Sequence, residues 1–494
     1  MVNLNGTHPE ETLDPEDWQA MRALGHQMVD DMFSFLQTAP SRPVWQPIPG
    51  EVREHFLTPV PEQPAGAEAA YKDFVQDVLP YPMGNFHPRF WGWVTGTGTP
   101  LGMLADMLAA AINPNLAGGD HAPNLVEAQV VDWCKQMLGY PPEASGLLVS
   151  GASMANLVGL TIARNSRAGY DVRKQGVQGQ TQRLTVYGSK EMHSSIQRAV
   201  EILGLGSNSL RLIPVNDNFE MDLEVLKIAI TADKALGYQP LCIVGCAGTV
   251  NTGAFDDLNT IADLCEREGI WFHVDGAFGA MAALAPALRH LTVGMERADS
   301  LAFDMHKWLY VPFEAACALV RHPAEHYEAF TLTADYTTHA RRGAAAGEVW
   351  FSDLGLQLSR GFRALKVWMS LKEHGTQKYG RLIQQNVEQV RYLADLIDTH
   401  PELERLAPAP LNIVCFRYQG EELDDEALNQ LNVELLMLLH ESGVAVPSYT
   451  RIGGKYAIRV ANTNHRSHRA DFDVLVQAVV EIGRRLVRER AAMR

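Results

Sequence analysis

Hydrophobic and polar positions follow two different periods along this chain. Between residues 146 and 320, short apolar or β-branched runs alternate with longer stretches in which apolar residues recur at helical spacing. The predicted strands cover residues 146–149, 183–187, 210–215, 241–247, 270–274, 300–303 and 315–320. The predicted helices between them cover residues 153–168, 192–203, 222–236 and 257–268. Because parallel strands need crossover connections, this order predicts a mostly parallel sheet of seven strands, covered by helices on both faces.

Different patterns flank this region. The N-terminal stripe of Trp18, Met21, Leu24, Met28, Met32 and Phe33 predicts a helix with one apolar face that must pack against something. Repeated prolines between residues 40 and 64 then predict an extended connector. After the sheet, a helix over 362–372 leads to a second α/β unit with strands at 411–418 and 456–461 and helices at 424–441 and 470–488.

These patterns divide the chain into three predicted regions. Residues 1–85 form a helical segment with a proline-rich connector, residues 86–375 a large domain, and residues 376–494 a smaller C-terminal α/β domain. The length of 494 residues and the apolar share of 46% are those of a folded protein with more than one domain. A small disulfide-stapled scaffold is excluded.

Charge and cysteine content narrow the function classes. The net charge of −16 argues against nucleic acid as a partner. The six cysteines contain no C-x-x-C pair, so they predict reduced core thiols rather than a zinc ribbon or a disulfide framework. The first residues lack the basic and apolar segments of a secretion signal, and no apolar stretch is long enough to cross a bilayer. We therefore expect a cytoplasmic protein without a membrane partner.

Polar residues directly after predicted strands are the candidates for chemistry, because ligands bind at the carboxyl ends of the strands in open α/β sheets. Three such places are weak signals alone. The run SGASMAN (150–156) opens a helix and fits an anion cradle or a plain helix cap. His193 fits a functional imidazole or a capping residue. The run GTVNTGAFD (248–256) fits a hydroxyl donor for phosphate or an ordinary turn.

Two further strand ends carry charge into apolar surroundings. In HVDGA (273–277) an apolar strand runs into Asp275, and a buried carboxylate needs a charged partner or a set of donors. In FDMHKWL (303–309) Lys307 precedes two apolar residues, and a lysine in such company can act as a nucleophilic amine. An anion cradle, a histidine, a strand-end aspartate and a strand-end lysine, in that order, are what a pyridoxal phosphate enzyme requires.

Longer motifs strengthen this interpretation. The segments are HPRFW (87–91), LADM (104–107), HSS (193–195), HVD (273–275), HKW (306–308) and GFRALKVW (361–368). With these segments the chain resembles the group II pyridoxal phosphate-dependent amino acid decarboxylases, including the aromatic-L-amino-acid enzymes. The resemblance implies the fold-type I, aspartate aminotransferase-like architecture. It also implies a homodimer with the active sites at the subunit interface. In such a dimer, the apolar stripe of the first helix predicts that the N-terminal segment packs on the partner.

The resemblance also assigns roles. Lys307 corresponds to the lysine that holds pyridoxal 5'-phosphate covalently, and Asp275 to the partner of the pyridine nitrogen. His193 corresponds to the imidazole stacked on the ring, and Ala277 to the small residue under its other face. Tyr336 falls at the catalytic tyrosine of a mobile loop, where related aldehyde synthases carry phenylalanine. The remaining cofactor positions are Ala152, Ser153 and Thr249 at the phosphate and His306 beside the lysine.

The substrate is less clearly indicated. Asp304 stands where the aromatic enzymes carry asparagine, and because a carboxylate would repel the cofactor phosphate, we expect it to face a donor or a cation. The pocket positions implied by the family are Trp93, Asn113, Asn115 and Ser359, with Asn113 and Asn115 facing the neighbouring subunit's pocket. An aromatic L-amino acid is the first expectation, and an acidic or small aliphatic one is the second.

Other functions remain as alternatives. An aldehyde synthase or an aminotransferase would use the same lysine and aspartate, and a silent cofactor-binding scaffold would be favoured only if one of them were missing. The stretch TGTGTPLG (95–102) has Leu101 at the third glycine position of the dinucleotide fingerprint, which disfavours a nicotinamide enzyme. No H-E-x-x-H motif or clustered cysteine and histidine pattern predicts a metal site.

Overall fold

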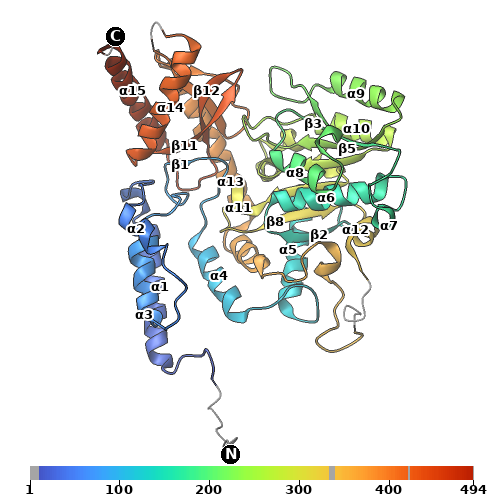
Figure 1. The fold of residues 1–494 in the computed structure, drawn as a ribbon, viewed down its shortest axis with the longest axis horizontal. Helices are drawn as coiled ribbons and strands as arrows, with labels where there is room; N and C mark the ends of the chain where they lie inside the picture. The colour runs from blue at the N-terminus through green and yellow to red at the C-terminus, as the bar shows by residue number, and fades with distance from the viewer. Residues whose placement is uncertain (1–10, 333–339, 421–422, 493–494) are drawn as a thin grey trace, which may run out of the picture.

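A computed structural model describes residues 11–332, 340–420 and 423–492, which form a large α/β part, a smaller α/β part and an N-terminal helical arm (Figure 1). The helices are α1 Trp18–Gln37, α2 Gly50–His55, α3 Ala67–Asp73, α4 Pro100–Ile112, α5 Ala122–Leu138, α6 Ala152–Arg167, α7 Val172–Gln175, α8 Ser194–Ile202, α9 Leu223–Ala235, α10 Leu258–Glu268, α11 Met305–Trp308, α12 Pro323–Phe330, α13 Arg363–Thr399, α14 Asp425–Glu441 and α15 Arg469–Ala492. The strands are β1 Phe90–Trp91, β2 Ser145–Val149, β3 Leu184–Ser189, β4 Leu210–Ile213, β5 Gln239–Cys246, β6 Trp271–Asp275, β7 Ser300–Asp304, β8 Ala316–Val320, β9 Leu403–Arg405, β10 Ile413–Tyr418, β11 Val446–Ile452 and β12 Lys455–Ala461.

The central sheet of the large part has seven strands in the order β2-β8-β7-β6-β5-β3-β4, which confirms the predicted mostly parallel sheet. Strands β3 to β7 pair in parallel with their neighbours, whereas β8 is antiparallel to both β7 and β2. Two antiparallel pairings in succession turn β2 back into the direction of β7. The carboxyl ends of β2, β3, β5, β6 and β7 therefore lie at the same edge of the sheet.

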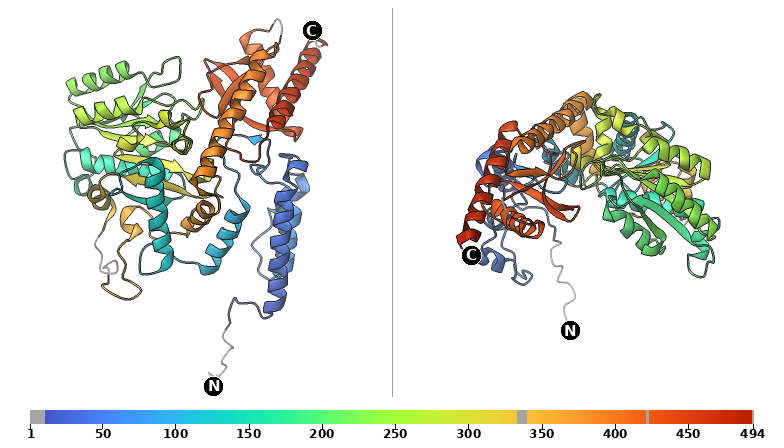
Figure 2. Two further views of the ribbon diagram at one scale, coloured as in Figure 1. Left: turned by 180° about the vertical axis from the view of Figure 1, so that it is seen from behind. Right: turned by 90° about the horizontal axis from the view of Figure 1, so that it is seen from above.

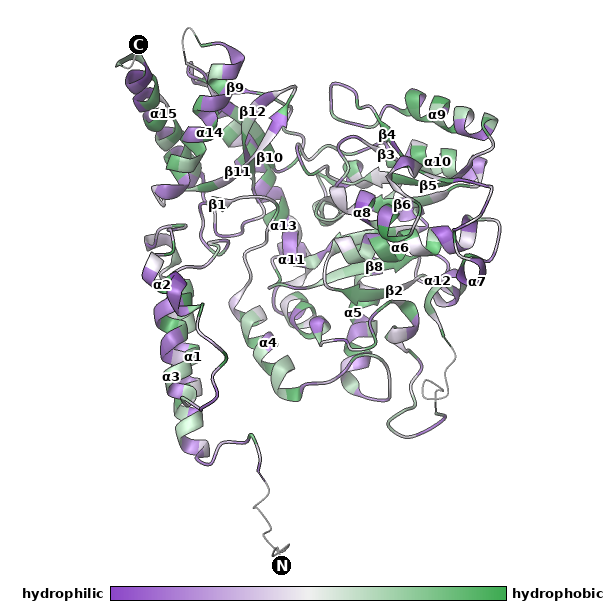
Figure 3. Cartoon of the chain, in the orientation of Figure 1, coloured by the Kyte–Doolittle hydropathy of each residue, from purple (hydrophilic) through white to green (hydrophobic). Residues whose placement is uncertain are grey.

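Both faces of this sheet are covered. Phe272 and Val274 of β6 pack into a cluster with residues of α5, α9, α10 and α13. Trp271 of the same strand packs into a second cluster on the opposite face, formed with α6 and α8. Strands buried on two sides are apolar almost throughout (green in Figure 3), which is why the sequence shows continuous apolar runs there. Burying one such side chain contributes about 1.5–3 kcal/mol.

The smaller part is built on a second sheet with the order β1-β11-β12-β10-β9. The predicted strands correspond to β10 and β12, and the predicted helices to α14 and α15. Helix α13 connects the two parts and runs past its predicted end at residue 372 to Thr399, with a break at Gly375. Gly375 has φ 67°, a left-handed conformation that glycine adopts without steric cost.

The N-terminal arm lies beside the body rather than in it. Helices α1 and α3 run alongside each other and project away from both sheets (Figures 1 and 2). The predicted apolar stripe is on α1, where Leu24 is buried but Trp18, Met21 and Phe33 remain exposed. The connector is not extended throughout as predicted, because the proline-free residues 50–55 form α2. In the described ranges, no helix has both the length and the apolar composition that a bilayer span requires.

Candidate active site

The candidate site lies at the carboxyl edge of the central sheet. Asp275 is the last residue of β6 and Asp304 the last residue of β7, while His193 immediately precedes α8 and Ala152 begins α6. These elements follow neighbouring or nearby strands, so residues scattered over more than one hundred positions of sequence converge on one edge. This is the placement that the strand-end reasoning predicts.

Asp275, Lys307, His193, Thr249 and Ala277 line one cavity of about 320 Å³. Other groups on its wall are Trp93, Cys246, Phe278, Ser448, Tyr449 and Arg459. Ser448, Tyr449 and Arg459 belong to the smaller part of the chain, so the cavity is formed by both parts. A volume of this size is at the lower end of small-molecule sites.

The Asp275 carboxylate is buried and held by donors on both oxygens. The backbone N–H of Ala277 donates to Oδ1 at 3.1 Å, and the Asn156 side-chain amide donates to Oδ2 at 2.9 Å. These bonds offset part of the cost of burying the charge and fix the plane of the carboxylate. The sequence required a partner for Asp275, and two donors are present.

Asp304 links the lysine to the start of α6. Its Oδ2 lies 2.8 Å from Lys307 Nζ, and its Oδ1 accepts the backbone N–H of Ala152 at 2.6 Å. The expectation that Asp304 faces a donor or a cation therefore agrees with both contacts. Because one carboxylate contacts both groups, the Lys307 amine is held next to the N-terminus of α6, where backbone N–H groups favour an anion.

Burial favours the neutral form of the two histidines near Lys307. Burial lowers the pKa of His193, and the nearby Asp275 carboxylate opposes this shift. Burial also lowers the pKa of His306, whose Nδ1 accepts the backbone N–H of Ala315 at 3.2 Å. His306 packs against Phe313, with ring centroids 4.3 Å apart, and is not on the wall of the cavity.

The remaining predicted positions lie elsewhere. Ser153 is exposed in the first turn of α6. Asn113 directly follows α4, and Asn115 is exposed and accepts the backbone N–H of Arg360 at 2.8 Å. Ser359 is exposed as well. None of these four residues lines the cavity within one chain. Tyr336 lies outside the described residues.

Sequence reasoning missed Arg459 of β12. Its guanidinium is buried and donates to the backbone oxygens of Asn251 (3.2 Å), Trp93 (2.8 Å) and Val250 and to Ser448 Oγ (3.1 Å). Burial lowers the pKa of Arg459 to about 10, and among the described residues no carboxylate neutralises it. Four of its five N–H groups are thus used. The available signal was a lone arginine inside the apolar run YAIRVA (456–461).

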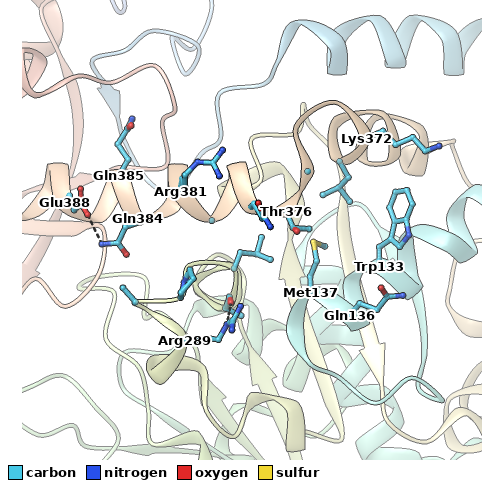
Figure 4. Close-up of a pocket in the computed structure, with 18 residues that line it drawn as sticks. Trp133, Gln136, Met137, Arg289, Lys372, Thr376, Arg381, Gln384, Gln385 and Glu388 are labelled. Carbon is cyan, nitrogen blue, oxygen red and sulfur yellow. Dashed lines mark hydrogen bonds between the residues drawn. The ribbon is translucent and has the colours of Figure 1, made fainter.

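A larger cavity of about 1140 Å³ lies between α5, the turn Gly279–Leu284 and α13 (Figure 4). Its wall carries Trp133, Met137, Arg289, Lys372, Arg381 and Glu388. It contains none of the residues that the motifs single out, so the candidate chemistry belongs to the smaller cavity. In the described part of the chain, no group of three or more histidine, cysteine, aspartate or glutamate side chains is placed to hold a metal ion.

Comparisons with known proteins agree with this geometry. The family model described as "Pyridoxal-dependent decarboxylase conserved domain" matches residues 49–419. An aromatic-L-amino-acid decarboxylase of Bacillus atrophaeus is 33% identical over 91% of this chain and 92% of its own. A phenylacetaldehyde synthase of Petunia hybrida is 28% identical over 91% of this chain and 90% of its own.

A solved structure shows the same architecture. The tryptophan decarboxylase of Catharanthus roseus, determined in complex with L-tryptophan, is 25% identical, with a TM-score of 0.85 over 96% of this chain and 100% of its own. The expected fold-type I architecture is thereby confirmed.

Proposed function

Because this chain belongs to the pyridoxal-dependent decarboxylase family, we propose that it removes CO2 from an aromatic L-amino acid to give the amine. The observation that carries the proposal is that Lys307, Asp275 and His193, distant in sequence, line one cavity. The relatives that act on aromatic amino acids support the substrate class.

The groups on the cavity wall fit pyridoxal 5'-phosphate. Lys307 offers a primary amine, Asp275 a carboxylate for a protonated ring nitrogen, and His193 an imidazole for the face of the ring, with burial favouring its neutral form. Thr249 on the wall and the backbone N–H of Ser153 at the start of α6 offer donors for a phosphate, whereas the N–H of Ala152 already donates to Asp304. When bound, this cofactor supplies an electron-poor ring that accepts the electron pair left behind by departing CO2.

The chain's own residues then have distinct tasks. The Asp275 carboxylate, with its plane fixed by Ala277 and Asn156, holds a proton on the ring nitrogen. Asp304 positions the Lys307 amine through the 2.8 Å contact. Tyr336 is assigned by resemblance as the group that protonates the substrate Cα.

Aromatic side chains on the cavity wall support an aromatic substrate. Trp93, Tyr449 and Phe278 line the cavity, and apolar or edge-to-face contacts with a substrate ring would favour such a side chain over an acidic one. Asn113, Asn115 and Ser359 lie outside this wall; Asn113 and Asn115 remain predicted to face the neighbouring subunit's pocket, and Ser359 remains a predicted pocket position.

We further propose that Arg459 attracts the substrate carboxylate, because it is a buried cation on the cavity wall with an N–H to spare. Arg459→Met is expected to raise the KM for the amino acid about 10- to 100-fold, the effect of losing a hydrogen bond from a charged donor. Steady-state kinetics with the preferred substrate would measure this change, and Arg459→Lys should recover part of it.

Arg417 provides the matched control for this prediction. It is a buried arginine on the neighbouring strand β10, but Glu404 and Asp425 pair with it at 2.6 Å and 2.8 Å, away from the cavity. Arg417→Met should affect thermal stability and leave KM near the wild-type value. An unchanged KM in Arg459→Met would remove Arg459 from substrate binding.

Product analysis tests the reaction itself. Purified protein loaded with pyridoxal phosphate is incubated with a panel of aromatic, acidic and aliphatic L-amino acids, and the products are identified by mass spectrometry. An aromatic amine is expected. An amine from another class would correct the substrate, whereas an aldehyde would favour the chemistry named for the Petunia hybrida relative and would contradict the role assigned to Tyr336.

We also propose that two copies of the chain form a homodimer through the N-terminal arm. The arm projects from the body (Figure 2) and exposes Trp18, Met21 and Phe33. Helix α4 also exposes Met107 and Ile112. Exposed apolar side chains of this size are typical of protein interfaces.

Charge substitutions on α1 test this interface. Met21→Glu combined with Phe33→Glu is expected to weaken the dimer at least about 100-fold, because each copy loses two exposed apolar side chains that the proposed interface would bury. Sedimentation analysis over a concentration series would measure the dissociation constant. Arg22→Glu, at an exposed polar position of the same helix, is the control. A dimer unaffected by the double substitution would place the interface elsewhere.

We propose a cytoplasmic location because of the state of the cysteines. All six are buried and unpaired in the structure, as expected for a protein of a reducing compartment.

A further inference from the structure

A continuous chain of buried hydrogen bonds runs from the interior of the large part to the candidate site. Trp271 Nε1 lies 2.8 Å from Ser300 Oγ, which lies 2.8 Å from His273 Nδ1. His273 Nε2 lies 2.9 Å from Asn156 Oδ1. Asn156 Nδ2 then lies 2.9 Å from Asp275 Oδ2 and 3.0 Å from Ser195 Oγ. The chain ends at His193 Nδ1, which lies 2.9 Å from Ser195 Oγ.

The donors and acceptors in the inner half of this chain can be assigned. An ionised carboxylate only accepts, so the Asn156 amide nitrogen faces Asp275 and its oxygen faces His273. His273 must then carry its proton on Nε2. Burial lowers the pKa of His273 to about 3, so the ring is neutral and Nδ1 accepts from the Ser300 hydroxyl. Ser300 in turn accepts from Trp271 Nε1, which can only donate.

The donors and acceptors between Asn156, Ser195 and His193 can be assigned from the same amide. The second N–H of Asn156 donates to Ser195 Oγ, so the Ser195 hydroxyl hydrogen is free to donate to His193 Nδ1. The backbone N–H of Ser195 also donates to this nitrogen at 3.2 Å. With two donors directed at Nδ1, the proton of neutral His193 is on Nε2. One amide group therefore connects the anchor of the cofactor nitrogen to the imidazole of the same site.

Gly159 of α6 leaves room for the side chains of His273 and Ser300. It lies inside α6, where glycine is less favourable than alanine. A Cβ at residue 159 would come within 2.7 Å of His273 Nδ1 and 2.8 Å of Ser300 Oγ. The helix thus lacks a side chain at the place where the His273–Ser300 pair needs the space.

We propose that Asn156, oriented by the His273–Ser300 pair, is a positioning residue that fixes both the plane of the Asp275 carboxylate and the proton of His193 on Nε2. The inference rests on the proposed function, because it concerns the same cofactor site. Asn156 does not line the cavity, so it acts through Asp275 and His193 rather than by touching the cofactor.

The proposal predicts a change in pH dependence as well as in rate. Without the Asn156 donor, the Ser195 hydroxyl can turn and accept from His193 Nδ1–H, which stabilises the charged ring. The other charged groups around His193 are Asp275 and Asp304, which favour its charged form, and Lys307 and Arg198, which oppose it. The pKa of His193 should therefore rise toward its ordinary value when Asn156 is removed.

The experiment compares holoenzymes loaded with pyridoxal phosphate. In Asn156→Ala, kcat is expected to fall about 10- to 100-fold. The acid-side transition in the absorbance and circular dichroism of the bound cofactor, recorded without substrate, should also move toward neutral pH. His273→Leu should give the same spectral change, because Asn156 is then no longer oriented. His273→Gln keeps an N–H donor for Asn156 and should restore the wild-type spectrum.

Asn165 is the matched control, an asparagine on the same helix whose amide contacts Arg164 and Ala329 instead. Asn165→Ala should leave the pH dependence and kcat unchanged. If Asn156→Ala and His273→Leu lower the melting temperature but keep the wild-type spectral transition, the role is structural and the inference is wrong. Failure of the wild-type protein to bind pyridoxal phosphate would instead refute the proposed function.

Discussion

Lys307→Ala is expected to lower turnover by about 100- to 10,000-fold, the range for losing a positioned catalytic group. The reason is that the Lys307 amine lies on the cavity wall and is held by Asp304 at 2.8 Å, and among the described residues it is the one lysine on that wall. Rates of amine formation would measure the loss. Borohydride reduction followed by peptide mass spectrometry would show whether the pyridoxyl label on the peptide that contains residue 307 disappears.

Lys307→Arg distinguishes the contribution of the positive charge from that of the primary amine. The guanidinium keeps a positive charge beside Asp304 but offers no primary amine, so it should be as inactive as the alanine variant while retaining more of the stability. A label that persists on another lysine, or turnover near the wild-type rate, would show that Lys307 does not have the assigned role.

Asp275→Asn is the second change with a large expected effect. Turnover should fall about 100- to 1000-fold, the usual consequence of removing one electrostatic group that acts on charge developing in the reaction. Cofactor affinity should fall much less, because Lys307 and the phosphate donors remain. The asparagine also cannot accept on both sides as Asp275 accepts from Ala277 and Asn156. Turnover and equilibrium binding of pyridoxal phosphate, measured side by side, test the difference.

Asp256 is the control for this substitution. It is also a buried carboxylate held by backbone donors, the N–H groups of Met221 and Cys246, but it does not line the cavity. Asp256→Asn should lower stability without the large loss of turnover. Equal losses of turnover and cofactor binding in Asp275→Asn would contradict a role for Asp275 on the ring nitrogen.

Local patterns were sufficient to predict the central sheet. All seven strands appear where apolar runs alternate with helical periods, because strands buried on both faces must be apolar along their whole length. Three strands were missed; β9 and β11 pair with strands close by in the sequence, whereas β1 depends on a distant partner. Phe90 and Trp91 form a two-residue strand only because they pair with Val446 and Pro447, more than 350 positions away.

The site was predictable in part for a related reason. Asp275 and Lys307 follow apolar strands, so their unusual surroundings are visible in the sequence. The roles of Asn156 and Arg459 are not visible in the sequence, because they depend on residues that only the fold brings together. Asn156 contacts Asp275 and His273. Arg459 contacts the loop at Val250 and Asn251. A lone polar residue in an apolar run predicts that partners exist without identifying them.

The buried cysteines can report on the unfolding of the two parts of the chain. They are distributed over both parts: Cys134 in α5, Cys242 and Cys246 in β5, Cys265 in α10, Cys317 in β8 and Cys415 in β10. Burial raises the pKa of the thiols of Cys242, Cys246, Cys265, Cys317 and Cys415, and modifying reagents react with the thiolate. Alkylation of Cys317 and Cys415, which do not line the site cavity, therefore requires the surrounding element to detach. Because Cys415 belongs to the small sheet and Cys317 to the large one, their relative labelling rates report whether the two sheets unfold together or one before the other.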